Sequence, residues 1–309
     1  MKNKLIKVLK ISLPISIGVY LTWYFVSNST ETEKEYFLKS LSEANYGWVL
    51  VALIIAFFAH LSRAYRWKYL LETLDLKPKL SLMYHSVMIG YIINLTIPRS
   101  GELARAAYFS RYQKTKSDQI FGTIVIERVI DLIMFALVFL IAFLFQSDQE
   151  KFNELRQISN SSSNPYLLPS LLILAIIFLG ILIGLKKVRV KVLNFLKGII
   201  QGATAILRLN NKIGFLIHTF FIWSCYIYML WVTSLALPGI ENITINAIFA
   251  CFVAGTIAIG ATPGGIGLYP IMVTSVLIEL YGYDGQVAKP FGMLTVSYTH
   301  LTLPTILLV

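Results

Sequence analysis

The fold is decided by residues 94–105, which read Asn-Leu-Thr-Ile-Pro-Arg-Ser-Gly-Glu-Leu-Ala-Arg. Pro98 interrupts an apolar run in this stretch, and three charged residues follow it closely: Arg99, Glu102 and Arg105. A second apolar run, residues 120–145, also carries three charged residues: Glu127, Arg128 and Asp131. A charged side chain at the centre of a bilayer costs about 2.5–3.5 kcal/mol, so such residues face protein or a polar cavity.

The composition places the chain in a membrane. Hydrophobic residues make up 56% of its 309 residues and charged residues only 14%, whereas a soluble domain has about 25% charged residues. The mean hydropathy is +0.68. The net charge of +11 lies in short loops between apolar runs, which indicates contact with anionic lipid headgroups rather than with nucleic acid. We therefore expect an all-α polytopic membrane protein with six to eight membrane segments.

The loop charges predict how the chain crosses the membrane. Four lysines precede a first span at residues 11–26, and no small-x-small cleavage site follows, so we expect an uncleaved span with a cytoplasmic N-terminus. The loop at residues 27–46 is acidic and should lie outside. A second span at residues 46–61 then returns to a basic, cytoplasmic end. The predicted location is the inner membrane of a bacterium.

The segment at residues 80–98 does not fit a full crossing. A crossing would place five basic residues of the following loop outside, against two acidic ones. We therefore predict a re-entrant or broken helix that turns back at or before Pro98, next to Gly101, and lines a protein-covered cavity. A similar break follows residue 262 and contains four candidate helix-breaking residues: Pro263, Gly264, Gly265 and Gly267. Because the two breaks are predicted to enter from opposite sides, the chain has the pattern of an inverted repeat.

The charged residues allow two compatible interpretations. Glu127 and Asp131 are four residues apart, so they share one face of a helix. In the first interpretation they form an internal salt-bridge network with Arg99 or Arg105 that holds the broken helix in place. In the second, the same region, with Asn94, is a polar site for a lipid headgroup, because arginine presents a bidentate fork to phosphate.

Other polar residues receive simpler expectations. In the second interpretation, Glu102 either orients an arginine or meets a cationic headgroup. An interfacial anchor is predicted for Arg63, Arg66 and Trp67, which follow the second span. The loop at residues 186–212 has seven basic residues and no acidic one, and residues 188–209 are expected to form an amphipathic helix on the inner surface. The two cysteines lie in apolar runs and the histidines are scattered, so neither a metal nor a cofactor is expected.

These motifs resemble the lysylphosphatidylglycerol synthase transmembrane-region family, also called flippase-like membrane proteins. The resemblance rests on four motifs in order: Arg63–Trp67, Asn94–Arg105, Glu127–Asp131 and Pro263–Gly267. It implies a membrane domain that translocates an aminoacylated lipid and that, in the full-length synthases, is joined to a soluble aminoacyl-transfer domain. That soluble domain has no counterpart here, so the enzyme name is not carried over. A glutamate frequent in the family after the last glycine is Pro270 here.

The sequence thus predicts a single membrane domain at residues 1–296, truncated at its C-terminal end, with residues 297–309 as a non-native tail. We expect a binding site for an anionic phospholipid or a lipid-linked headgroup and a role as flippase or translocase. One alternative is a membrane enzyme or an accessory subunit of glycolipid or aminoacyl-lipid synthesis. Another is a non-catalytic scaffold that recruits a soluble enzyme through residues 186–212.

Overall fold

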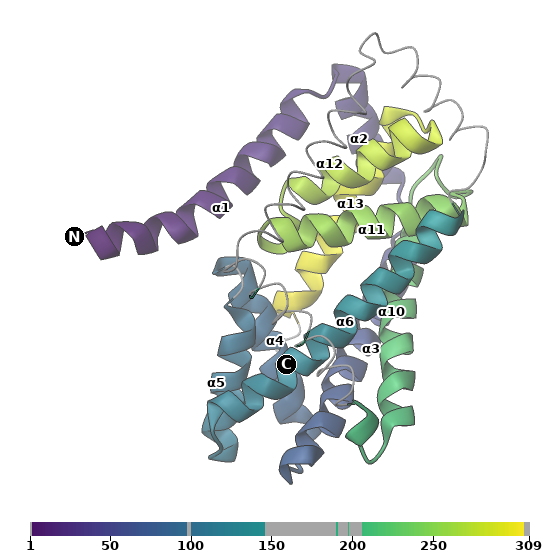
Figure 1. Ribbon diagram of the computed structural model, residues 1–309. Helices are drawn as coiled ribbons and strands as arrows, with labels where there is room; N and C mark the ends of the chain where they lie inside the picture. Colours follow the sequence, from purple (N-terminus) through teal and green to yellow (C-terminus); the bar gives the residue numbers. More distant parts are fainter. Residues whose placement is uncertain (1, 98–99, 146–189, 191–196, 198–205, 306–309) are drawn as a thin grey trace.

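The computed structural model describes residues 2–97, 100–145, 190, 197 and 206–305, and every regular element among them is a helix (Figure 1). The principal helices are α1 (Lys2–Ser27), α2 (Glu31–Glu43), α3 (Tyr46–Leu71), α4 (Leu80–Thr96), α5 (Gly101–Gln113), α6 (Ser117–Phe145), α10 (Lys212–Ser234), α11 (Ile245–Ala261), α12 (Leu268–Ser275) and α13 (Gly285–Thr305). Short turns of helix are η1 (Glu72–Leu74), η2 (Ile206–Arg208), η3 (Pro263–Gly265) and the π-helical turn Val276–Leu280.

Three of the described helices are apolar and long enough to cross a membrane. They are α3 with the turn that follows it, at 29 residues, α6 at 29 residues and α10 at 23 residues. At 1.5 Å per residue even 23 residues span roughly 35 Å, more than the hydrocarbon core of a bilayer. The predicted all-α polytopic membrane fold is therefore confirmed. The second span is longer than predicted, because α3 continues beyond residue 61 to Leu71.

The first predicted break is a reversal of the chain. The helix α4 ends at Thr96, α5 begins at Gly101, and the two helices pack against each other (Figure 1). The side-chain oxygen of Asn94 accepts a hydrogen bond from the Gly101 N–H at 2.8 Å. Any Cβ at Gly101 would collide with the carbonyl oxygen of Gly90, so the two backbones touch directly. Pro98 and Arg99 lie outside the described residues.

The second break has the same plan. The helix α11 ends before η3, and Gly264, Gly265 and Gly267 have φ values of 61°, 82° and 74°, a region that favours glycine. The following helix, α12, packs back on α11, and Tyr269 lies directly against Gly255. All three glycines thus have left-handed backbone at the turn between α11 and α12.

The element order repeats along the chain. Helices α3–α6 follow one order: a long helix, a 17-residue helix, a break, a second helix and another long helix. The same order recurs in α10–α13. Moreover, α4 contacts η3, so the first hairpin touches the second break. The inverted orientation of the two copies stays a prediction, since the order of elements does not define their sidedness.

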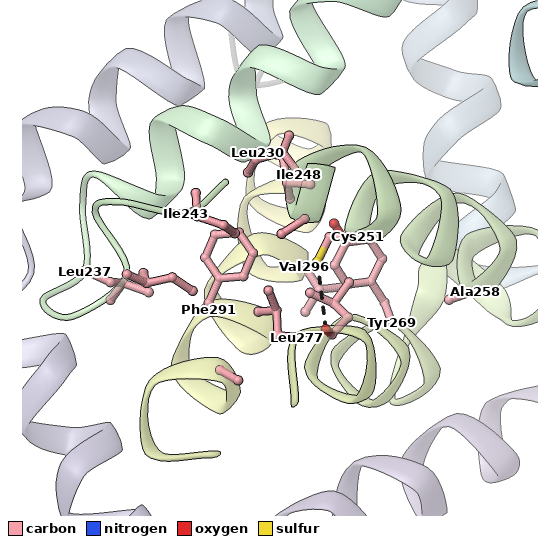
Figure 2. Packing of buried hydrophobic residues seen from close by; sticks show 14 of the residues in the cluster. Leu230, Leu237, Ile243, Ile248, Cys251, Ala258, Tyr269, Leu277, Phe291 and Val296 are labelled. Carbon is pink, nitrogen blue, oxygen red and sulfur yellow. Dashed lines mark hydrogen bonds between the residues drawn. The ribbon is translucent and has the colours of Figure 1, made fainter. Parts of the chain in front are cut away.

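A large apolar core belongs to the second copy. Figure 2 shows residues of α10, α11, α12 and α13 meeting in one cluster, which includes Ile248, Cys251, Tyr269 and Phe291. The thiol of Cys251 lies 3.9 Å from the carbonyl oxygen of Val273, as expected for a small core residue. Residues 297–305, set aside above as a tail, continue the helix α13. Most of the predicted inner-surface helix at residues 188–209 lies outside the described residues.

The N-terminal helices are attached to this second copy. The backbone of α1 at Gly18 lies against Ile266 and Gly267 of the second break. The helix α2 begins with a capping box, and Lys289 of α13 donates a hydrogen bond to the Glu33 carboxylate at 2.6 Å. Burial raises the pKa of Glu33, but the hydrogen bonds from Lys289 and Thr30 outweigh burial and leave that pKa below its ordinary value. The predicted external loop at residues 27–46 therefore contains a docked helix.

Candidate functional site

Two arginines of α3 face two acids of α6. Arg63 and Arg66 lie one helical turn apart, as do Glu127 and Asp131, so each pair presents its charges on one helix face. The two oxygens of Asp131 accept from Arg63 Nη1 at 3.0 Å and from Arg66 Nη1 at 2.9 Å. Arg66 Nη2 also donates to Glu127 Oε1 at 3.3 Å. These bonds join the two membrane-length helices through charged groups.

The first hairpin joins this network through Arg105 of α5. Its Nη1 lies 2.8 Å from Glu127 Oε2, and its guanidinium stacks 3.8 Å from the centre of the Trp67 ring. The Trp67 indole in turn donates to Thr123 Oγ1 of α6 at 2.9 Å. A cation held between a carboxylate and an aromatic face has few other positions available. The hairpin is therefore fixed to α3 and α6 by one side chain.

The buried part of the network carries excess positive charge. The side chains of Arg66 and Glu127 are 0% exposed, Arg105 is 3%, Arg63 is 5% and Asp131 is 12% exposed. Three guanidinium groups against two carboxylates leave one net positive charge. Within the described part of the chain, Nη2 and Nε of Arg105 have no hydrogen-bond acceptor. Because isolated buried charge is costly, this arrangement favours an additional anion.

A more exposed rim borders the buried part. Arg128 lies 3.6 Å from Glu102 through Nε and 3.4 Å from Asp131 through Nη1. The Asn94 side-chain amide donates to Glu102 at 3.5 Å, so the rim includes the end of the first hairpin. The polar residues of the first hairpin and α6 thus form one network with both buried and partly exposed members.

The structure brings together nearly all of the residues predicted for the polar site. Asn94, Glu102, Arg105, Glu127, Arg128 and Asp131 belong to one network. The predicted internal salt bridges are confirmed by the pair of Arg105 with Glu127. Arg99 lies outside the described residues, and binding of a headgroup stays a prediction.

The interfacial anchor predicted for Arg63, Arg66 and Trp67 needs a correction. All three side chains are buried and contact α6, so they belong to the charged network instead of facing the membrane boundary. The sequence contained a usable signal: the three-residue spacing of the arginines matches the four-residue spacing of the acids. Thr123 and Thr219, the hydroxyl partners of Trp67 and Arg66, were not predicted.

The second break has a different chemistry. Pro263 and Gly265 are buried, and Tyr269 occupies the place beside Gly255. No ion pair lies within residues 263–275, which the structure describes in full. In the described part of the chain, no group of three or more His, Cys, Asp or Glu side chains is arranged to hold a metal ion.

Comparisons with known proteins place the chain in a family. The family described as lysylphosphatidylglycerol synthase TM region matches residues 9–307. The UPF0104 membrane protein MJ1595 of Methanocaldococcus jannaschii is 29% identical over 101 residues, which cover 32% of this chain and 30% of that relative. No solved structure matches. With the family match extending over nearly all 309 residues, the chain belongs to the lysylphosphatidylglycerol synthase TM region family.

Proposed function

We propose that the protein moves a phospholipid or a lipid-linked headgroup across the membrane through the polar site at the first hairpin. The family places the chain among integral membrane proteins of lipid metabolism or transport. The observation that carries the proposal is the net positive charge buried between α3, α5 and α6. Two arginines would neutralise the two buried carboxylates, and the third leaves an excess positive charge that a bound anion would balance.

A phosphodiester monoanion would balance this charge. Arg105 has two unpartnered donor groups within the described network, and a guanidinium binds phosphate oxygens in a bidentate manner. Arg99 is next to the first break in the sequence, and we assign it to the same phosphate. Glu127 and Asp131 hold the arginines in place, while Glu102 sets the charge at the rim.

The breaks themselves supply the bends that such a path requires. Backbone that leaves the helical pattern at membrane depth is tolerated where protein or a water-filled cavity covers it. The glycines at 264, 265 and 267 provide left-handed backbone at the second bend. The contact between α4 and η3 places this second bend beside the first hairpin.

The proposed orientation puts the N-terminus in the cytoplasm of a bacterium and the protein in its inner membrane. In this orientation the C-terminal end of α5, which contains Arg111, is cytoplasmic. A membrane-impermeant thiol reagent should therefore leave Arg111→Cys unlabelled in intact cells and label it after lysis. Labelling in intact cells would contradict both the orientation and the re-entrant assignment of α4.

Transport is testable in proteoliposomes that contain a fluorescent phospholipid. The wild-type protein should equilibrate the probe between leaflets, and Asp131→Asn should abolish this movement because Asp131 holds Arg63 and Arg66 in place. Glu31→Gln, which removes a surface ion pair, is the matched control and should transport normally. Size-exclusion chromatography establishes which variants remain folded. A folded Asp131→Asn protein with wild-type transport would refute the proposed site, and headgroup turnover by the wild type would indicate an enzyme instead.

A further inference from the structure

The rim pair of Arg128 and Glu102 differs from the buried ion pairs in its geometry. The buried contacts of Arg63, Arg66 and Arg105 measure 2.8–3.3 Å, but Arg128 Nε is 3.6 Å from Glu102 Oε1. The second contact of Arg128, to Asp131, is 3.4 Å long. Both distances exceed the usual range of a charge-assisted hydrogen bond. Arg128 is thus balanced in charge but weakly held.

Exposure separates Arg128 from the other arginines of the network. Its side chain is 41% exposed and that of Glu102 is 28% exposed, whereas the side chains of the other three network arginines are at most 5% exposed. Among the described arginines of the network, Arg128 is therefore the one most accessible to a ligand from outside the protein. Arg128 also contacts Asp131, the partner of buried Arg63 and Arg66, so it borders the buried part of the network.

We propose that Arg128 is the residue that first binds the phosphate, and that it does so by leaving Glu102. This inference rests on the proposed function and names a step at the same site. Glu102 acts as a competitor of the ligand for the guanidinium, while the buried arginines supply a positive background and stay paired. The class of ligand is a phosphodiester, whose two free oxygens fit the arginine fork.

The exchange is linked to the first hairpin. Asn94 donates to Glu102 at 3.5 Å, and its oxygen accepts from the Gly101 N–H at 2.8 Å, where α5 begins. When Glu102 loses Arg128, its remaining side-chain partner among the described residues is Asn94, which accepts from the first N–H of α5. Binding of the phosphate is therefore communicated to the chain reversal through one side chain.

The competition predicts opposite effects from the two partners. Glu102→Gln removes the competitor, and because exposed ion pairs are weak, the affinity should rise by up to about fivefold. Arg128→Gln removes the charged donor, and the affinity should fall by at least about tenfold. Arg128→Lys, which keeps the charge without the fork, should lie between the wild type and Arg128→Gln.

The chain offers a closely matched control. Lys68 and Glu72 form an ion pair of 3.7 Å with side-chain exposures of 35% and 27%, similar to the rim pair in length and exposure. Lys68→Gln and Glu72→Gln should leave the affinity unchanged. The probe is dihexanoylphosphatidylglycerol, titrated into the purified full chain in detergent and followed by calorimetry. Dihexanoylphosphatidylcholine and inorganic phosphate in parallel distinguish an anionic lipid, a zwitterionic lipid and a free anion.

Each outcome decides a different point. A rise for Glu102→Gln with a fall for Arg128→Gln supports the exchange, even if the wild type shows no transport, in which case only the proposed function fails. Equal affinities in the wild type and both variants overturn the exchange, while transport by the wild type would leave the proposed function intact. Weaker binding by Glu102→Gln, or no binding of the probe by the wild type, also overturns the exchange.

Discussion

Replacing Glu127 by glutamine tests whether the buried network is organised by charge. Glu127 is fully buried and pairs with Arg105 at 2.8 Å and with Arg66 at 3.3 Å. Glutamine keeps the shape but removes one negative charge, so the buried excess rises from one to two positive charges. Arg66 retains Asp131, but Arg105 loses its carboxylate partner among the described residues. Breaking a buried pair costs about 3–5 kcal/mol, and we expect a loss of stability in this range.

A second substitution should restore part of this loss. Arg105→Gln on its own removes a buried cation, and together with Glu127→Gln it returns the buried part to one net positive charge. The double variant should therefore be more stable than Glu127→Gln alone, with a coupling energy of about 1–3 kcal/mol. If the two substitutions only damaged packing, each would cost stability independently and the two losses of stability would add.

The measurement is the unfolding of the purified protein in mixed micelles as the amount of a denaturing detergent is increased. Loss of helix is followed by circular dichroism. Glu31→Gln serves as the control, since its side chain is 83% exposed and its pair with Lys34 lies on the surface. A loss below about 1 kcal/mol for Glu127→Gln would refute the charge argument. A double variant as unstable as the sum of its parts would refute the pairing of Arg105 with Glu127.

Three further substitutions test the hairpin, the stacked arginine and the α2 contact. Gly101→Ala should destabilise by about 1–3 kcal/mol or prevent folding, because its Cβ would meet the Gly90 carbonyl; in Gly122→Ala, where nothing lies within 4 Å, stability should be unchanged or higher. In Trp67→Phe, loss of the indole donor and of part of the cation–π contact should cost about 1–2 kcal/mol in the same unfolding assay. Because the pKa of Glu33 is lowered in the folded protein, the ionised carboxylate should stabilise the fold fully above the unfolded-state pKa of about 4.3 and lose this effect as the pH falls through the folded-state pKa. Glu33→Gln should abolish this pH dependence when unfolding is measured across that range.

The sequence predicted the first hairpin because its evidence is local. Pro98 and the basic residues after it lie within one short stretch. The positive-inside rule disfavours placing those charges on the outer side of the membrane, and it applies without knowledge of any tertiary contact. The second bend was predictable for a similar reason, since three glycines beside Pro263 indicate unusual backbone in any fold. Local chemistry was therefore sufficient for the class of fold and for both breaks.

The interior position of Arg63 and Arg66 was not predictable from the same kind of evidence. An arginine near the end of an apolar run has the same hydropathy whether it faces lipid headgroups or a carboxylate. Whether the arginine is buried depends on its partner, and Asp131 is 65 residues away from Arg66 in the sequence. Because this ion pair offsets part of the cost of burial, α3 continues as a helix past the point where hydropathy alone would end it.

The two copies of the helical pattern differ where the site lies. Gly90 precedes Pro98 by the same number of residues as Gly255 precedes Pro263, and each glycine lies against the helix after the break. In the first copy the contact is with the backbone of Gly101 and the Cβ of Arg105, whose guanidinium pairs with Glu127. In the second copy it is with the ring of Tyr269, in an apolar core. A shared backbone plan therefore gives two bends, but in the described residues only the first bend lies beside a buried net positive charge. Among the described residues, an anion bound at the first hairpin would find no equivalent counter-charge at the second break, which favours the first hairpin as the place to test for recognition of a phosphate.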